Sequence, residues 1–382
     1  MNRTWILSTS LILFFIGLVM IYNTTSAEVI DRELATSPFA ATIKQFLYAI
    51  FAAGICSIIW YVGYERLIEF SPKLMTYTVI CLLLVFVPGI GMKINGARRW
   101  IGVGGFSFQP SELAKGVIPL YFIFLTTSEE EFGLNAFVNF LFRISLPLLL
   151  ILIEPDNGST AVILATLCIL FFLAEVKMSW WATPLCFLTL FGALIGSQMS
   201  HVAARIKIYL HPELDLLGKG HQPYQAKIAS GSGGLFGRGL GESLQKLNYL
   251  PEARSDYIAA IYAEEFGFIG MLILILLYVS IGYFGVRIAM RAPTKRGFLV
   301  ASIATFLITF QAFINLGVVS ALLPSKGMSL PFLSQGGTSL LFNMILLTLL
   351  FQVESHASEI ITGGRRNRWP HSTRKKNPRG AF

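Results

Sequence analysis

One acidic side chain stands where a long polar segment turns into an apolar run. Asp256 follows a segment of about residues 200–256 that carries many cations, and an apolar stretch begins at residue 258. A carboxylate near lipid and beside cations can have its pKa set by opposing desolvation and charge effects, as a general base requires. Aspartate is also favoured as the N-cap of a helix. The sequence therefore leaves two interpretations of Asp256, a catalytic base and a helix cap.

Several cations lie where a phosphorylated ligand could meet them. Arg98 and Arg99 belong to the short segment 91–108 (GMKINGARRWIGVGGFSF), Arg205 to the long segment, and Lys326 to a later loop rich in proline, glycine and serine. Guanidinium forks match phosphate oxygens in bidentate geometry. Headgroup phosphates or a nearby carboxylate would compensate the two adjacent arginines equally well. We predict a phosphate site, with lipid headgroups as the alternative.

Other polar residues fall inside apolar runs. Glu112 and Lys115 are three residues apart and share one helix face. Charges at membrane depth are costly unless they are paired or line a polar cavity, so an internal ion pair and a ligand groove both remain open for them. Glu264, Asn315 and Ser334 are further candidates for substrate binding. The sequence shows no cluster of metal ligands, although a divalent cation could still accompany a phosphorylated substrate.

The composition indicates a chain that is solvated by lipid. Of the 382 residues, 54% are hydrophobic and 13% are charged, whereas soluble proteins carry about 25% charged residues. Stretches of roughly 20 apolar residues can span a bilayer. The net charge of +9 then favours anionic membrane lipid over nucleic acid as a partner. The expected spans are 5–22, 45–64, 73–90, 109–126, 136–153, 158–174, 178–198, 258–286, 297–320 and 336–353.

The sequence thus predicts an all-α integral membrane protein with about ten transmembrane helices and a large extracytoplasmic loop between spans 7 and 8. With the N-terminus inside, 15 Lys and Arg residues fall on cytoplasmic segments and 13 on outer ones, 7 of these in the long loop. Long loops constrain orientation weakly, so both termini are expected in the cytoplasm. Residues 1–358 form the membrane domain, and 359–382 form a basic tail expected to be disordered.

Four blocks of sequence, in this order, resemble one known family. They are GARRWIGVGGFSFQPSELAK, EPDNGST, SGSGGLFGRGLGESLQKLNYLPEARSDYIAAIYAEEFG and NLGVVSALLPSKGMSLPFLSQGGTSLLFN. Together with the ten-span pattern they resemble the SEDS family of cell-wall glycosyltransferases over residues 5–353. The glycine-rich block and the Ser325-Lys326-Gly327 loop look more like the FtsW branch, for division, than the RodA branch, for elongation.

The resemblance implies a peptidoglycan glycosyltransferase that polymerises lipid II, a disaccharide pentapeptide on undecaprenyl pyrophosphate. It implies a class B penicillin-binding protein and other divisome membrane proteins as partners, in the cytoplasmic (inner) membrane at the division septum. The family's aspartate falls on Asp256, but the usual His-Thr before it is Arg254-Ser255 here, and arginine cannot relay a proton. A lipid II flippase and a purely structural scaffold are the rival functions.

Overall fold

The structure is a computed structural model that describes residues 2–31, 37–94, 97–103, 106–128, 132–198, 207, 209–216, 218, 220–247, 250–324 and 327–361. Two predicted site residues, Arg205 and Lys326, lie outside these ranges, as does the basic tail from residue 362.

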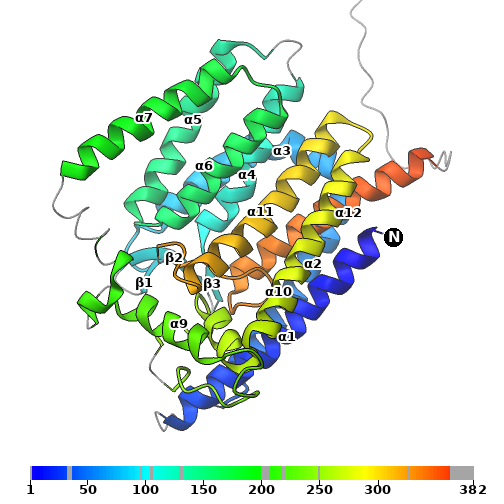
Figure 1. Ribbon diagram of the computed structural model, residues 1–382. Helices are drawn as coiled ribbons and strands as arrows, with labels where there is room; N and C mark the ends of the chain where they lie inside the picture. Colours follow the sequence, from blue (N-terminus) through cyan, green and yellow to red (C-terminus); the bar gives the residue numbers. More distant parts are fainter. Residues whose placement is uncertain are drawn as a thin grey trace, which may run out of the picture.

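A bundle of long helices forms the body of the protein (Figure 1). Seven helices within the described residues are long and apolar enough to cross a membrane, and α6 and α7 contain shorter apolar stretches. An all-α membrane fold is therefore confirmed. The long helices are α1 (Asn2–Asp31), α2 (Ala40–Val62), α3 (Tyr64–Leu84), α4 (Pro110–Ser128), α5 (Leu134–Ile153), α6 (Asn157–Leu173), α7 (Met178–Gln198), α10 (Ile258–Met290), α11 (Lys295–Val319) and α12 (Gly337–Ile361).

The third span begins earlier than the hydropathy pattern predicted. We expected 73–90, but α3 runs from Tyr64 to Leu84. Gly63 alone separates it from α2, with φ of 85° and ψ of 147°. Because glycine adopts positive φ without steric cost, a single residue reverses the chain and no polar loop is needed. The charged residues after Gly63 therefore belong to the first turns of a helix.

The segment between α3 and α4 is a small antiparallel sheet that the sequence analysis did not predict. Its strands are β1 (Gly91–Ile94), β2 (Ala97–Val103) and β3 (Phe106–Phe108), paired in the order β1-β2-β3. The Thr338 hydroxyl of α12 donates to the Ser107 carbonyl at 3.2 Å and accepts from the Gln109 amide. The sheet is thereby tied to the start of α12.

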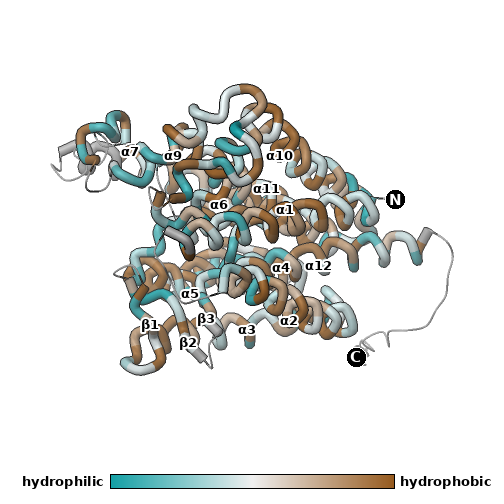
Figure 2. The backbone as a smooth tube through the Cα atoms, turned by 90° about the horizontal axis from the view of Figure 1, so that it is seen from below, coloured by the Kyte–Doolittle hydropathy of each residue, from teal (hydrophilic) through white to brown (hydrophobic). Residues whose placement is uncertain are grey.

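The two ends of the bundle differ. The sheet, the short helix η1 (Pro212–Asp215) and α9 (His221–Ser232) gather at one end, which we call the site end (Figure 1). The first residues of α1 and the last turns of α12 meet at the opposite end, where Arg3 donates to the Ser355 hydroxyl at 3.3 Å. Hydrophobic residues run along α1, α10 and α11, and hydrophilic ones gather near α9 (Figure 2).

Helix α10 is broken near the site end. Residues 231–247, which we call the glycine-rich segment, provide hydrogen-bond acceptors at the break. Gly267 has φ of 64° and ψ of −161°, which interrupts the helical hydrogen bonds. The amides of Phe268 and Ile269 instead donate to the carbonyls of Gly234 and Leu235 at 2.9 and 3.2 Å. A Cβ on Gly237 would lie 2.0 Å from the Glu265 carbonyl oxygen. The glycines therefore allow close packing of two backbones.

Candidate active site

Asp256 lies immediately before α10, and it is not the cap of that helix. The N-cap is Tyr257, and no side-chain capping hydrogen bond is present in this described region. The N-cap interpretation is therefore wrong. The Asn315 amide of α11 donates to the backbone carbonyls of Asp256 at 2.8 Å and Met328 at 2.7 Å. A Cβ on Gly327 would lie 2.8 Å from Asp256 Oδ2, so this glycine leaves room for the carboxylate.

The Asp256 carboxylate opens into a polar cavity of about 310 Å³ at the site end. The walls come from the sheet, α4, α6, α11, α12 and the segments around residues 255 and 328. The cavity is lined by Ile94, Ala97, Arg99, Trp100, Ser107, Gln109, Glu112, Lys115, Ser159, Glu252, Ser255, Asp256, Gln311, Gly327, Met328, Ser329, Gln335, Gly336 and Ser339.

The environment of Asp256 raises its pKa to about 7. Burial is the largest cause because it disfavours the charged form, and the negative charges of Glu252 and Asp156 act in the same direction. Arg99 opposes them and lowers the pKa. A carboxyl group with a pKa near neutrality can accept a proton and release it again, as a general base must.

The two adjacent arginines of β2 face different surroundings. Arg99 lines the cavity, and its Nε and Nη2 donate to the carbonyls of Glu154 and Pro155 at 2.9 and 2.8 Å. Arg98 is exposed and is absent from the cavity wall. The register of β1 and β2 shifts here, because Met92 pairs with Trp100 and Lys93 with Arg98, so that Arg99 is an extra residue without a partner on β1. Such a bulge redirects a side chain, which explains the separation. Sequence analysis treated both as substrate ligands, and the structure brings only Arg99 to Asp256.

Glu112 and Lys115 form a buried ion pair that also lines the cavity. Lys115 Nζ lies 2.7 Å from Glu112 Oε1 and 3.2 Å from the Gln311 amide oxygen. Among the described residues Glu112 Oε2 has no hydrogen-bond partner. The two interpretations of this pair are therefore compatible, since the charges neutralise each other while one carboxylate oxygen stays free for a ligand.

The turn between α5 and α6, in which the sequence analysis singled out no site residue, contributes to the site. Asp156 caps α6 by accepting from the Ser159 amide at 3.1 Å, and it also accepts from Gln109 and Ser111. The neighbouring Glu154 is buried, and its pKa is raised to about 8 by burial and by Asp156. The sequence EPDN carried no signal for this role beyond two acids in one turn.

Glu264, a predicted substrate ligand, is placed elsewhere. Its carboxylate accepts from the Ser243 hydroxyl and from the amides of Leu244 and Gln245 at 3.2 and 3.3 Å. Arg238 lies 3.5 Å away. Since these groups occupy both oxygens and Glu264 is outside the cavity lining, the residue holds the glycine-rich segment in place.

Beside Glu264 lies a second polar cluster, the Lys246 network, made of Asn23, Lys246 and Glu265. Lys246 Nζ donates to Glu265 at 3.0 Å and to Asn23 Oδ1 at 2.7 Å, and the Asn23 amide returns hydrogen bonds of 2.7 and 2.6 Å to Glu265. All three residues are buried. The network joins α1, the glycine-rich segment and α10 across the break.

Asn315 and Ser334 hold the backbone around Asp256 and do not line the cavity. The Ser334 hydroxyl donates to the Ser255 carbonyl at 2.6 Å and accepts from the Leu330 amide. Both residues therefore fix backbone around Asp256 rather than meet a ligand directly. Among the described residues no group of three or more His, Cys, Asp or Glu side chains could hold a metal ion.

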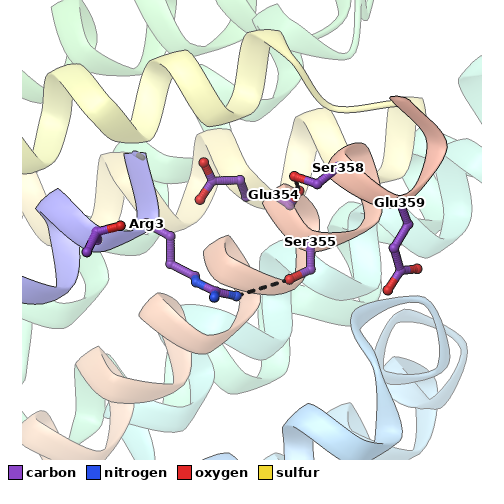
Figure 3. Close-up of a pocket in the computed structure, with 6 residues that line it drawn as sticks. Arg3, Glu354, Ser355, Ser358 and Glu359 are labelled. Atoms are coloured by element: carbon purple, nitrogen blue, oxygen red, sulfur yellow. Dashed lines mark hydrogen bonds between the residues drawn. The ribbon is translucent and has the colours of Figure 1, made fainter. Parts of the chain in front are cut away.

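A separate cavity of about 330 Å³ lies at the opposite end (Figure 3). Arg3 reaches across it from α1, and the α12 residues on the far side include two carboxylates. It is distant from Asp256 along the bundle and lies between the start of α1 and the last turns of α12. Its lining residues are Arg3, Thr4, Glu354, Ser355, Ser358 and Glu359.

Comparison with known proteins agrees with this architecture. A family model described as "Cell cycle protein", FTSW_RODA_SPOVE, matches residues 3–359. The chain is 38% identical to stage V sporulation protein E of Bacillus subtilis, covering 91% of this chain and 95% of the relative. It is 34% identical to the probable peptidoglycan glycosyltransferase FtsW of Legionella pneumophila, covering 92% and 90%.

Two solved structures share the fold. A chain of a peptidoglycan synthase complex, described as coordinating polymerization and crosslinking, superposes with a TM-score of 0.72 at 22% identity over 90% of this chain and 97% of that one. The rod shape determining protein RodA of Thermus thermophilus superposes with a TM-score of 0.65 at 24% identity over 92% and 96%. From the family match and the length of the sequence similarity, the chain belongs to the FtsW/RodA/SpoVE family of membrane proteins.

Proposed function

We propose that the chain is a peptidoglycan glycosyltransferase that polymerises lipid II, with Asp256 as its general base. One observation carries the proposal: the Asp256 carboxyl, with a pKa of about 7, opens into a polar cavity that also presents Arg99 and Lys115. A base, two cations and a cavity at the end of a membrane bundle are what transfer from a lipid-linked diphosphate requires. The relatives named as peptidoglycan glycosyltransferases support it.

The proposed reaction joins two lipid-linked sugars. Asp256 takes the proton of an acceptor sugar hydroxyl as its oxygen attacks the anomeric carbon of the donor. The bond from that carbon to the diphosphate breaks with inversion, and undecaprenyl pyrophosphate leaves with the electron pair. Diphosphate is a good leaving group, so stabilisation of its charge by Arg99 and Lys115 replaces the general acid that a glycoside hydrolase needs. The free oxygen of Glu112 is available to an acceptor hydroxyl.

The surroundings of the reaction follow from the same assignment. Lipid II would present its sugars outside the cell, which sets the site end as extracytoplasmic and both chain termini as cytoplasmic. The relatives named FtsW favour the division septum and the division branch. The solved complex, described as coordinating polymerization and crosslinking, supports a crosslinking partner, and we propose that this partner is a class B penicillin-binding protein. Arg205 and Lys326 remain proposed phosphate ligands, and a divalent cation bound through the diphosphate remains compatible with the site.

The test is glycan-strand formation from labelled lipid II by the purified chain with its penicillin-binding partner. Asp256→Asn should reduce strand formation by about 10²–10⁴-fold while the protein stays folded. Undiminished polymerisation by that variant would refute the assignment of the base. Movement of fluorescent lipid II across vesicle membranes, with no strands formed by the parent protein, would instead support the flippase.

A further inference from the structure

The glycine-rich segment exposes apolar side chains beside a membrane-spanning helix. Leu235 is 62% exposed and Phe236 is 80% exposed, although both lie in a connection between helices. Next to them, Phe268 and Ile269 of α10 are 63% and 42% exposed. We call these four residues the apolar tip. The hydrogen bonds from Phe268 and Ile269 to Gly234 and Leu235 make the tip continuous.

The depth of the tip follows from the length of α10. The stretch from Phe268 to Val286 lies between the break at Gly267 and the first cation, Arg287. At 1.5 Å per residue it covers ~28 Å, about the thickness of the hydrocarbon core. Phe268 is therefore the first spanning residue at the site end. Leu235 and Phe236 lie at the same level, because their segment is hydrogen-bonded to that turn.

The polarity of the segment is inverted relative to a loop in water. Two of its polar side chains turn inward, Ser243 toward Glu264 and Lys246 toward Glu265. The side chain of Arg238, two residues after Phe236, is 37% exposed and lies 3.5 Å from the Glu264 carboxylate. The exposed carboxylate of the segment, Glu242, comes after the tip. Charges paired inside and large apolar groups outside are the arrangement expected where the solvent is hydrocarbon.

Several backbone groups of the segment are hydrogen-bonded within the protein. Non-helical backbone is tolerated at membrane depth only where its polar groups are satisfied. Here the Gly237 amide donates to the Gly233 carbonyl at 2.8 Å. The amides of Arg238 and Gly239 donate to the backbone carbonyls of Glu264 and Glu265, both at 3.0 Å. The carbonyls of Gly234 and Leu235 are used by α10.

We propose that the apolar tip is a lipid-binding surface, with Leu235 and Phe236 inserted among the acyl chains of the leaflet at the site end. The long connection between α7 and α10 is then partly a re-entrant membrane element. The tip adds apolar contact at the break in α10, and through the backbone hydrogen bonds there it sets the height of the first turns of α10 relative to the membrane surface.

The experiment places a photo-crosslinker in the tip of the full chain. Phe236 is replaced by p-benzoylphenylalanine, the protein is reconstituted in phosphatidylethanolamine and phosphatidylglycerol nanodiscs, and adducts are identified by intact mass after irradiation. The matched control carries the same group at Leu214, which is 58% exposed in η1 between two acidic residues. Leu276, which is 56% exposed in the middle of the spanning part of α10, serves as the positive control.

We expect phospholipid adducts at position 236 at ~10-fold or more the yield at 214, since the partition of a phenylalanine-sized group into an apolar phase is at least of this order. Equal yields at 236 and 214, or a crosslink from 236 to a second copy of the chain, would overturn the proposal. If the variant at 236 fails to fold, the same label at Leu235 repeats the test. The measurement involves no turnover, so it stands apart from the assignment of the base.

Discussion

Two buried polar clusters at the site end use the same residue types differently. Lys115 and Glu112 are paired at 2.7 Å on one helix, and Lys246 and Glu265 at 3.0 Å between two segments. Around the cavity, however, polar atoms such as Glu112 Oε2 and Gln311 Nε2 are buried without a partner among the described residues. In the Lys246 network, Asn23 completes the pairing.

The difference in hydrogen bonding distinguishes a ligand-binding site, the cavity, from a structural cluster, the Lys246 network. Buried polar groups in folded proteins are nearly always hydrogen-bonded, so the unsatisfied atoms of the cavity mark positions where a ligand is expected. The satisfied cluster has nothing left to offer a ligand, and its loss should affect folding. Stability and turnover should therefore respond to different mutations.

The largest effect is expected at the base. Asp256→Asn should reduce the rate of strand formation by about 10²–10⁴-fold, the usual contribution of a general base. Its melting temperature should not fall, because the amide removes a charge that is costly to bury. Strand formation from labelled lipid II and a thermal melt of the same preparation measure the two. A lower melting temperature with full activity would reverse our view of the site.

The Lys246 network should give the opposite pattern. Lys246→Met leaves the Glu265 carboxylate buried without its cation, which typically costs about 3–5 kcal/mol of stability. The melting temperature should drop clearly, while turnover per folded molecule is retained. The double change Lys246→Met with Glu265→Gln should recover much of the loss, because no unpaired charge then remains. If the double variant does not recover stability, the Lys246 network does not stabilise the protein through charge pairing.

The neighbouring arginines offer a matched pair on one strand. Arg99→Ala removes a cation from the cavity and two hydrogen bonds to the turn after α5. Since a hydrogen bond involving a charged group contributes about 1.5–3 kcal/mol, activity should fall by ~10-fold or more. Arg98→Ala, on the exposed face, should change activity and stability little, as surface substitutions usually do. Equal losses of activity from the two variants would argue against the assignment of Arg99 to the cavity and of Arg98 to the exposed surface.

The smallest effect is a shift in pH dependence. Asp256 acts as a base only when ionised, so activity should rise with pH through its pKa of about 7. Glu252→Gln removes a negative charge that raises this pKa, and the acidic limb of the rate profile should therefore move to lower pH. An unmoved limb would mean that another group controls it.

The raised pKa of Asp256 also makes the stability of the folded protein depend on pH. A carboxyl whose pKa is raised by folding destabilises the native state once the pH exceeds its unfolded value, and the loss grows as the pH rises to the folded value. Between about pH 4 and pH 7, the Asp256→Asn variant should therefore lose less stability than the parent. Thermal melts across this range measure the difference.

The sequence was sufficient to predict the helical bundle and three of the residues that line the cavity with Asp256, namely Arg99, Glu112 and Lys115. Hydropathy located the spans because lipid imposes a length on each helix, and Glu112 with Lys115 stood out because charges are rare at that depth. It failed at α3, where Gly63 replaces a loop by a single residue. It also failed to separate Arg98 from Arg99, since that requires knowing that the segment forms a strand.

Two further errors have a common origin. Glu264 was predicted as a ligand from its helical spacing after Asp256, yet the glycine-rich segment packs against it near the break at Gly267. Asp156 was overlooked because its contacts are with Gln109 and Ser111, at the start of another helix. Both roles depend on contacts between segments far apart in the chain, which local patterns do not encode.

The side-chain amide of Asn315 connects the backbone of Asp256 to that of Met328. One nitrogen of α11 holds the carbonyl of Asp256 at 2.8 Å and that of Met328 at 2.7 Å. A pull on the connection between α11 and α12 cannot move Met328 without stretching one of these bonds or dragging the aspartate with it. Force applied to that connection by a neighbouring protein would thus be transmitted to the carboxyl group through a single rigid planar group.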